Sequence, residues 1–121
     1  MAKNNCQLQL MWEDNTLVAS ICGELDHHGA VAVRTLIDGE ICRQRPERTV
    51  LELSSLDFMD SSGLGLVMGR YTLMQKLGGD FCVRNANPRV MKIFKLAGLE
   101  RIVRIEKASD GKEKRNEAKG K

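Results

Sequence analysis

The sequence predicts a single α/β domain, in which a mixed β-sheet of four or five strands is packed with α-helices. Its 121 residues, 42% hydrophobic and 29% charged, suit one globular core and leave no length for a second. After an initial pair of strand-like segments, short apolar segments alternate with segments of helix length. This alternation is typical of βαβ crossovers and therefore predicts a mostly parallel sheet with an antiparallel hairpin at its start.

The N-terminal third is expected to form that hairpin and the first helix. Apolar or alternating residues over 6–12 and 16–22 predict two strands joined by a short turn. Asp26 then stands where it can cap a helix over 27–44, in which apolar residues recur every three or four positions. The residues of this expected buried stripe are Ala30, Val33, Leu36, Ile37 and Ile41.

The middle of the chain predicts a buried strand, a loop and a second helix. Residues 49–53 form the apolar strand, and residues 54–60 a polar loop with an apolar plug. A helix over 61–77 follows, and a Gly-Gly pair ends it. Its expected inner stripe is Leu64, Val67, Met68, Tyr71, Met74 and Leu77.

The last expected elements are a strand, a helix and a closing strand. Residues 81–84 form the strand, and Asn87 followed by proline opens a helix that runs to residue 96. A glycine ends this helix, and residues 102–105 can close the sheet.

Charge is distributed unevenly along the chain. Residues 1–106 hold 13 basic and 13 acidic residues, so the net charge of +3 comes entirely from the polar, basic tail at 107–121, which we expect to be disordered. The balanced part offers no basic field for nucleic acid or a membrane surface, and five aromatic residues are few for base stacking. No apolar run approaches the roughly 18 residues of a membrane span. We therefore expect a cytoplasmic protein without direct nucleic-acid or membrane partners.

The residue types that bind metals or form disulfides show no functional spacing. The four cysteines follow no zinc or redox pattern and are read as reduced thiols. They are Cys6, Cys22, Cys42 and Cys82. His27 and His28 are expected in the first turn of the first helix, one of them partly packed and the other exposed. The sequence thus predicts neither a metal site nor a cofactor.

Residues 59–70, MDSSGLGLVMGR, are the most distinctive segment, and three interpretations compete. Glycines at 63, 65 and 69 could let a backbone approach a nucleotide phosphate at a helix start. Against this, the expected loop separates them from the preceding strand, and no acidic residue ends the strand at 81–84 to bind a ribose. Serine catalysis needs Gly-x-Ser-x-Gly, which neither serine satisfies, and the two adjacent histidines are the only bases on offer.

The third interpretation is structural: Ser61 or Ser62 caps the helix, and the glycines allow the helix to pack closely on the sheet. It does not explain why two serines and the acidic residues Asp57 and Asp60 crowd one exposed helix start. A surface serine at this position can be phosphorylated without unfolding the domain, because a helix N-terminus tolerates a dianion.

Four motifs together resemble one family. They are GELDHH at 23–28, LDFMDSSGLG at 56–65, GRY at 69–71 and Asn-Pro-x-Val-x-x-x-Phe at 87–94. Their order and spacing are similar to those of the anti-sigma factor antagonists of the STAS family, above all the antagonists of the sporulation sigma-F pathway. The resemblance covers about residues 6–106 and implies a STAS domain over residues 1–106. Relatives carry a more apolar final helix where this chain has its polar tail.

The resemblance implies a regulatory switch and not an enzyme. In the family, the unphosphorylated antagonist binds an anti-sigma factor that is itself a serine kinase, and the sigma factor is released. The kinase phosphorylates the first serine of Asp-Ser-Ser-Gly, which corresponds to Ser61, and a serine phosphatase resets the switch. The implied partner-binding residues are Asp26, Asp60, Ser61, Ser62 and Gly63. The alternative is a STAS scaffold module of a stress-signalling assembly that does not act on a sigma factor.

Overall fold

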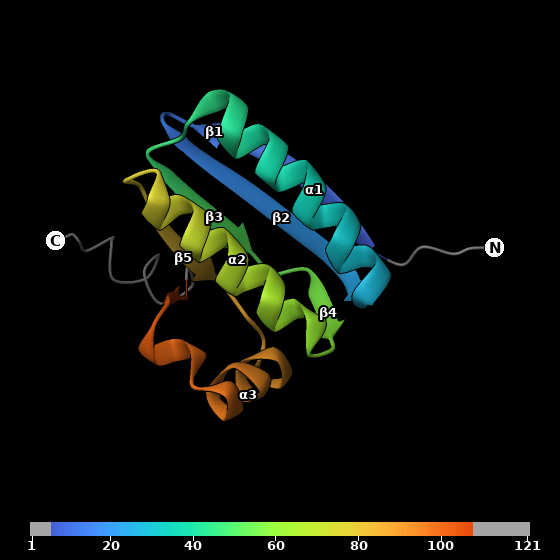
Figure 1. The fold of residues 1–121 in the computed structure, drawn as a ribbon. Helices are drawn as coiled ribbons and strands as arrows, with labels where there is room; N and C mark the ends of the chain where they lie inside the picture. The colour runs from blue at the N-terminus through green and yellow to red at the C-terminus, as the bar shows by residue number, and fades with distance from the viewer. Residues whose placement is uncertain (1–5, 108–121) are drawn as a thin grey trace, which may run out of the picture.

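The computed structural model describes residues 6–107, so the expected tail lies, apart from Lys107, outside the described residues. Strands and helices follow one another as the sequence predicts, with one additional strand and one short 3-10 helix (Figure 1). The elements are β1 (Cys6–Glu13), β2 (Thr16–Leu25), α1 (His27–Gln44), β3 (Arg48–Glu52), β4 (Leu56–Met59), α2 (Ser62–Lys76), β5 (Asp80–Arg84), α3 (Pro88–Ala97), η1 (Leu99–Arg101) and β6 (Arg104–Glu106).

The strands form one mixed sheet in the order β1-β2-β3-β5-β6, and β4 pairs with the end of β2. The hairpin of β1 and β2 is antiparallel, with an unbroken register from the Cys6–Gly23 pair to the Glu13–Thr16 pair. All other pairs are parallel, as crossover helices require. The predicted mixed α/β fold is therefore confirmed.

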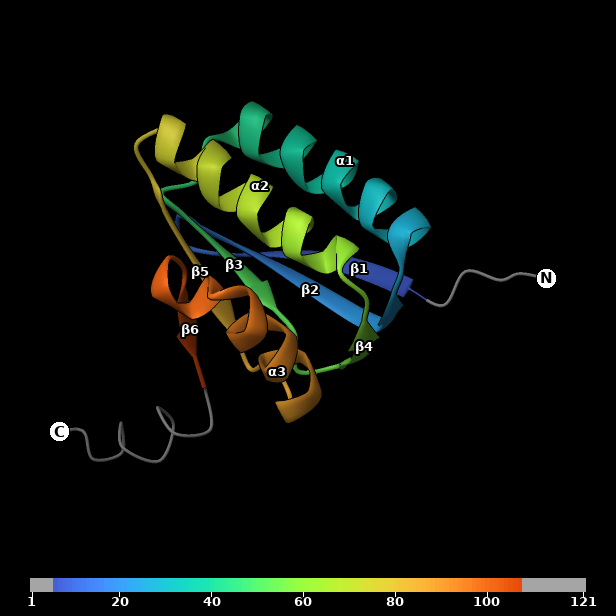
Figure 2. The same cartoon turned by 60° about the horizontal axis from the view of Figure 1, so that its bottom comes forward.

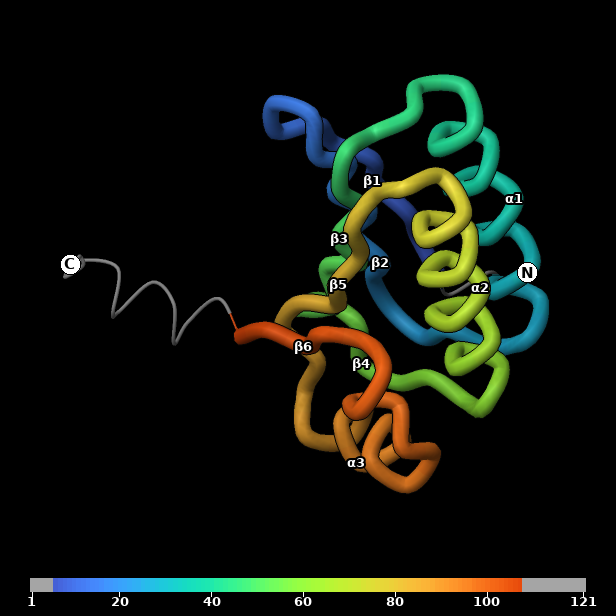
Figure 3. Tube along the Cα trace, turned by 60° about the vertical axis from the view of Figure 1, so that its left-hand side comes forward, coloured from blue at the N-terminus to red at the C-terminus, as the bar shows by residue number. Residues whose placement is uncertain are grey.

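Helices α1 and α2 lie side by side on one face of the sheet, and α3 covers one end of it (Figures 2 and 3). Alternate residues of the central strands, such as Leu17, Ala19 and Leu51, are fully buried against these helices. On the same side, the Thr49 hydroxyl donates to the Met74 sulfur at 3.2 Å. The main core therefore lies between the sheet and its helices.

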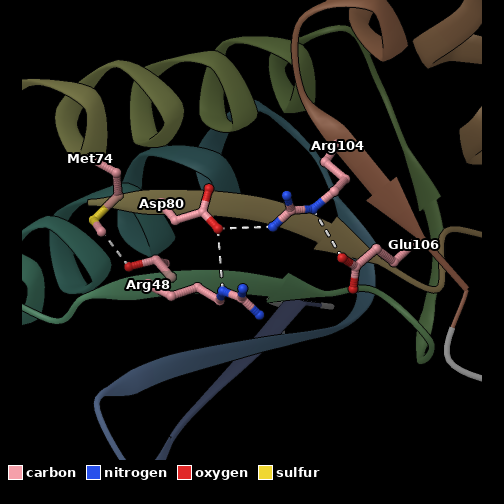
Figure 4. Close-up of polar contacts among 6 residues, drawn as sticks. Arg48, Met74, Asp80, Arg104 and Glu106 are labelled. Carbon is pink, nitrogen blue, oxygen red and sulfur yellow. Dashed lines mark hydrogen bonds and ion pairs between the residues drawn. The ribbon is translucent and has the colours of Figure 1, made fainter. Parts of the chain in front are cut away.

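The other face of the sheet carries a small buried cluster of Val18, Val50 and Cys82. Charged side chains that flank this cluster are paired across three strands (Figure 4). The Asp80 carboxylate lies 2.9 Å from the Arg104 guanidinium and 3.4 Å from that of Arg48. Arg104 also reaches Glu106 at 3.0 Å. These ion pairs connect β3, β5 and β6.

The expected loop over residues 54–60 contains a strand, which raises the sheet to six strands. Strand β4 joins the carboxyl end of β2 after a shift of register between Gly23 and Glu24. Only its first and last residues, Leu56 and Met59, are buried. The sequence pattern did not predict this strand because its two buried residues stand three positions apart and therefore do not alternate with exposed residues.

One expectation about the helices is wrong, and one buried residue was not foreseen. Leu36 is 58% exposed, although the periodicity of α1 placed it in the core. Conversely, Arg70 is 5% exposed within the inner stripe of α2. Its guanidinium lies 2.7 Å from the Asp38 carboxylate of α1. Burial lowers the pKa of Arg70, and the charge of Asp38 opposes that effect.

The cysteines and histidines lie partly in the core and partly at the surface. None of the four cysteines, all of which lie in the described part of the chain, forms a disulfide. Cys6 and Cys82 are buried, and burial raises the pKa of both thiols. Both His27 and His28 are exposed, so the expectation that one is partly packed is wrong.

Candidate functional site

The residues that precede α2 and α3 are hydrogen-bonded to strands β2 and β4. Asp26 follows β2, Asp60 follows β4 and Asn87 lies beyond β5. The Asp60 N–H donates to the Leu25 carbonyl at 3.2 Å, and the Asn87 side-chain amide donates to the Leu56 carbonyl at 2.9 Å. The starts of α1 and α2 are therefore adjacent, and the start of α3 lies against the beginning of β4.

The start of α1 is capped as the sequence predicts. Asp26 has an extended backbone, and its carboxylate accepts from the Gly29 N–H at 2.8 Å. Gly29 is buried, and a Cβ there would lie 3.2 Å from that of Cys6. The exposed Asp26 side chain is thereby held at the surface next to the first turn of the helix.

The start of α2 is built differently, and the expectation that a serine caps it is wrong. The Asp60 carboxylate accepts from the Ser62 N–H at 2.9 Å and also from the Ser62 hydroxyl. Ser61, the residue just before the helix, already has helical angles of φ −64° and ψ −17°, and its side chain forms no capping hydrogen bond. The capping side chain is thus Asp60, one residue earlier.

These contacts keep Asp60 ionised. The hydrogen bond from the Ser62 hydroxyl is the largest cause of a lowered pKa at Asp60, and the charge of His27 acts in the same direction. A fixed negative charge therefore stands immediately before Ser61.

Ser61 itself is exposed, and the surface beside it is open. One helical turn further, Gly65 is also exposed, and a Cβ built on it would have no neighbour within 4 Å. Phe58, which the sequence interpretation included in the apolar plug, is 42% exposed on β4. No sequence signal distinguishes it from its buried neighbours. These features leave room for another molecule to approach the Ser61 hydroxyl.

Gly63 has the opposite environment. It is buried, and a Cβ at this position would lie 2.5 Å from the sulfur of Met59, which is 1% exposed. The absence of a side chain therefore lets α2 approach β4, as the structural interpretation of the glycines requires. Gly65 and Gly69 have no such close neighbour. Of the expected partner-binding residues, Asp26, Asp60, Ser61 and Ser62 lie at the adjacent starts of α1 and α2, and Gly63 lies beneath them.

A hollow of about 330 Å³ adjoins Ser62 between the first turns of α1 and α2. Arg34 is the arginine of its lining, and part of the wall is apolar. The lining residues are His27, Ala30, Val31, Arg34, Ser62, Gly65 and Leu66.

The first-turn amides of α2 are occupied, which argues against a phosphate cradle. Ser62 donates to the Asp60 carboxylate, Gly63 to the Asp60 carbonyl and Leu64 to the Ser61 carbonyl. Strand β4 does place a strand directly before this turn, so the objection based on loop length is wrong. Gly65 lies inside the helix, however, and not in a phosphate-binding loop.

Within residues 6–107, no group of three or more His, Cys, Asp and Glu side chains is arranged to hold a metal ion. No helix in the same range is both long and apolar enough to cross a membrane.

The fold and the site together define a small α/β domain. It presents an exposed serine, whose side chain caps no helix, at the end where parallel strands finish. The model of the STAS domain family matches residues 8–111, and the chain belongs to this family. It is 41% identical over 101 residues to the anti-sigma F factor antagonist of Paenibacillus polymyxa, and this match covers 84% of the chain and 86% of the relative.

Solved structures agree with this assignment. The anti-sigma factor antagonist SpoIIAA in its unphosphorylated form superposes with a TM-score of 0.75 at 30% identity, covering 93% of this chain and 97% of SpoIIAA. The Bacillus cell fate determinant SpoIIAA in its phosphorylated form gives a TM-score of 0.68 at 30% identity, with coverages of 89% and 98%. The predicted family resemblance is confirmed.

Proposed function

We propose that this protein is a cytoplasmic anti-sigma factor antagonist controlled by phosphorylation of Ser61. The unphosphorylated form binds an anti-sigma factor serine kinase, and the sigma factor is released. Phosphorylation ends this binding, and a serine phosphatase restores it. The anti-sigma F factor antagonist of Paenibacillus polymyxa and the two SpoIIAA structures support this role.

The observation that carries the proposal is the free hydroxyl of Ser61. Because the Asp60 carboxylate caps α2, Ser61 can be modified without the loss of a capping hydrogen bond. Its exposure and the bare Gly65 one turn away give a kinase access to the hydroxyl.

Charge explains how phosphorylation could act on binding. A phosphoserine adds about −1.5 to −2 charge at neutral pH. At Ser61 this charge would lie beside the ionised Asp60, on a surface that otherwise meets the partner with a neutral hydroxyl. Loss of about 3 kcal/mol of binding free energy weakens an interaction more than a hundredfold. A switch therefore needs no change of fold.

The partner surface we propose consists of Asp26, Asp60, Ser61 and Ser62, with Phe58 as an apolar contact. The four polar residues are exposed or half-buried, and Phe58 is 42% exposed. Buried Gly63 supports this surface from below by allowing α2 to pack on Met59.

Incubation with purified anti-sigma factor serine kinases and ATP tests the proposal. Intact mass should increase by one phosphate, and peptide mapping should place it on Ser61. Ser61→Ala should remove the signal, whereas the matched control Ser62→Ala should keep it. Phosphate that persists in Ser61→Ala, or that maps to Ser62, would contradict the assignment.

Ser61→Asp tests whether charge at this position controls binding. One added charge should weaken kinase binding about tenfold, less than the more than hundredfold effect of phosphate. Titration with the kinase gives the affinity, and a thermal melt checks the fold. Wild-type affinity in a folded Ser61→Asp protein would mean that charge does not operate the switch.

A further inference from the structure

A hollow of about 480 Å³ lies along helix α3, which Figure 2 shows at the end of the sheet away from α1. The core side chains of α3 are Val90 and Phe94. At 3.6 residues per turn, Lys92, Lys95 and Leu96, which line the hollow, stand on the opposite, outer face of the helix. The volume of the hollow is in the range that is typical of small-molecule sites.

Part of the wall of this hollow is apolar. Ala86 and Met91 line it, the first buried and the second half-buried against the core. Leu96 is 81% exposed, more than any other large hydrophobic side chain in the described part of the chain. A single exposed leucine is ordinary, but Leu96 adjoins a concave apolar wall. An apolar group bound in the hollow would therefore remove Leu96 and Met91 from water together.

The charged side chains of the hollow are all positive. Lys92 and Lys95 belong to α3, Lys107 follows β6, and no acidic residue of the described part joins them in the lining. None of the ion pairs within residues 6–107 involves these lysines. The neighbouring Glu106 pairs with Arg104 at 3.0 Å. The hollow thus combines an apolar wall with three exposed ammonium groups that form no ion pair within the described residues.

The stability of α3 explains only one of these lysines. Lys95 lies in the last turn, where a cation interacts favourably with the helix dipole. Lys92 lies in the middle of the helix, and Arg89 and Lys95 stand three positions before and after it, at a spacing where like charges repel. Between Arg84 and Glu100 the chain carries no acidic residue to offset them. The balanced charge of residues 1–106 thus conceals a local concentration of positive charge along α3.

We propose that this hollow binds a small organic anion with an aliphatic chain, such as a medium-chain carboxylate. The anionic head offsets the repulsion among the lysines, and the chain covers Met91 and Leu96. An inorganic anion would leave the apolar wall in water, and an uncharged apolar molecule would leave the ammonium groups without a counter-charge. The inference does not depend on the proposed function, because the hollow shares no lining residue with the partner surface around Ser61.

Calorimetric titration of the full chain with decanoate, below the concentration at which decanoate forms micelles, tests the proposal. Binding should saturate at a single site per chain. Each methylene group that leaves water should strengthen binding about fourfold, so octanoate should bind about tenfold more weakly than decanoate. Acetate and inorganic phosphate, which have no aliphatic chain, should show no saturable binding.

Two variants with matched controls locate the site. Lys92→Gln and Leu96→Asn should each weaken decanoate binding by at least about threefold, through loss of charge and of apolar contact respectively. Both side chains are exposed, so neither change should unfold the domain. The controls Lys76→Gln on α2 and Leu36→Asn on α1 make the same changes at exposed positions outside the hollow, and they should bind as the wild type does.

Amide NMR shifts and lipid vesicles complete the test. Saturating decanoate should shift the amides of α3 and leave those at the start of α2 unchanged, and phosphatidylglycerol vesicles should not co-sediment the protein. The absence of saturable decanoate binding, or an equal effect of each variant and its control, would overturn the proposal. Co-sedimentation with vesicles that Lys92→Gln abolishes, without binding of free decanoate, would assign the hollow to a membrane surface and overturn it as well.

Discussion

The starts of α1 and α2 have the same sequence pattern and different capping. In each case the preceding strand ends in an apolar residue, and an aspartate, two further residues and a buried glycine follow it. The segments run from Leu25 to Gly29 and from Met59 to Gly63. In α1 the aspartate is the capping residue and accepts from the amide three positions later. In α2 it accepts from the amide two positions later.

The hydrogen bond of Asp60 leaves the Ser61 hydroxyl available. At α2 the backbone of Ser61 is already helical, so Asp60 satisfies the Ser62 amide and the Ser61 side chain forms no cap. At α1 the residue after the aspartate is already the first of the helix, His27. The same local pattern thus forms an ordinary capped helix in one place and a capped helix preceded by an exposed, unbonded serine in the other.

Substitution of the two buried glycines should give the largest difference in stability between the two helix starts. Gly63→Ala should destabilise the fold by about 1–3 kcal/mol, because its Cβ would lie 2.5 Å from the Met59 sulfur. Gly29→Ala meets Cys6 at 3.2 Å and gains helix propensity, so its cost should be near zero. Urea unfolding measures both, with Gly65→Ala as a control in open space. Equal costs at 63 and 29 would contradict the difference in packing.

The two aspartates should contribute similarly despite their different positions. Asp26→Ala and Asp60→Ala should each reduce the free energy of unfolding by about 1 kcal/mol, the usual cost of a lost capping side chain. Asp57→Ala is the matched control, since this exposed aspartate forms no capping contact, and it should stay within about 0.5 kcal/mol of wild type. If Asp60→Ala changes the free energy of unfolding as little as Asp57→Ala does, Asp60 is not the cap.

The capping contribution of Asp60 should depend on pH. Its pKa is lowered in the folded protein by the hydrogen bond from Ser62, so folding favours the ionised carboxylate. The contribution is therefore complete above the ordinary pKa of about 4 and is lost as pH falls through the lowered value. The difference in unfolding free energy between wild type and Asp60→Asn should shrink below about pH 4. A difference that grows on acidification would mean that folding raises the pKa of Asp60 and does not lower it.

Ser61→Ala should have the smallest effect on stability. The side chain is exposed and caps nothing, so the free energy of unfolding should change by less than about 0.5 kcal/mol. Thermal unfolding of this variant beside Ser62→Ala, which removes a hydrogen bond to Asp60, measures the contrast. A loss above about 1 kcal/mol at Ser61 would show that its hydroxyl does support the helix.

The order of the main elements could be predicted because their signals are local. Apolar periodicity identified α1 and α2, and the Asp26 and Asn87 caps stand where the sequence placed them. The Asp-Ser-Ser-Gly segment was placed correctly at a helix start. Each of these signals lies within a few residues of the feature that it predicts.

The remaining features depend on tertiary structure. Leu36 continues the apolar period of α1 but lies on the side toward the sheet edge, where no described element covers it. Arg70 is tolerated inside because Asp38 of another helix pairs with it. At the site, the Ser61 side chain forms no cap because the Asp60 carboxylate accepts from the Ser62 amide, and residue types alone did not distinguish Asp60 from the serines as the cap.

The ion pairs around Asp80 have a consequence for folding kinetics. Strand β6 has only three residues and joins the sheet after a crossover through α3, so it offers little local structure to a folding nucleus. The contacts of Arg104 with Asp80 should therefore form after the transition state. Interactions that form late slow unfolding without accelerating folding. These side chains are about half exposed, so each ion pair on the helix-free face should slow unfolding only modestly and leave the folding rate unchanged.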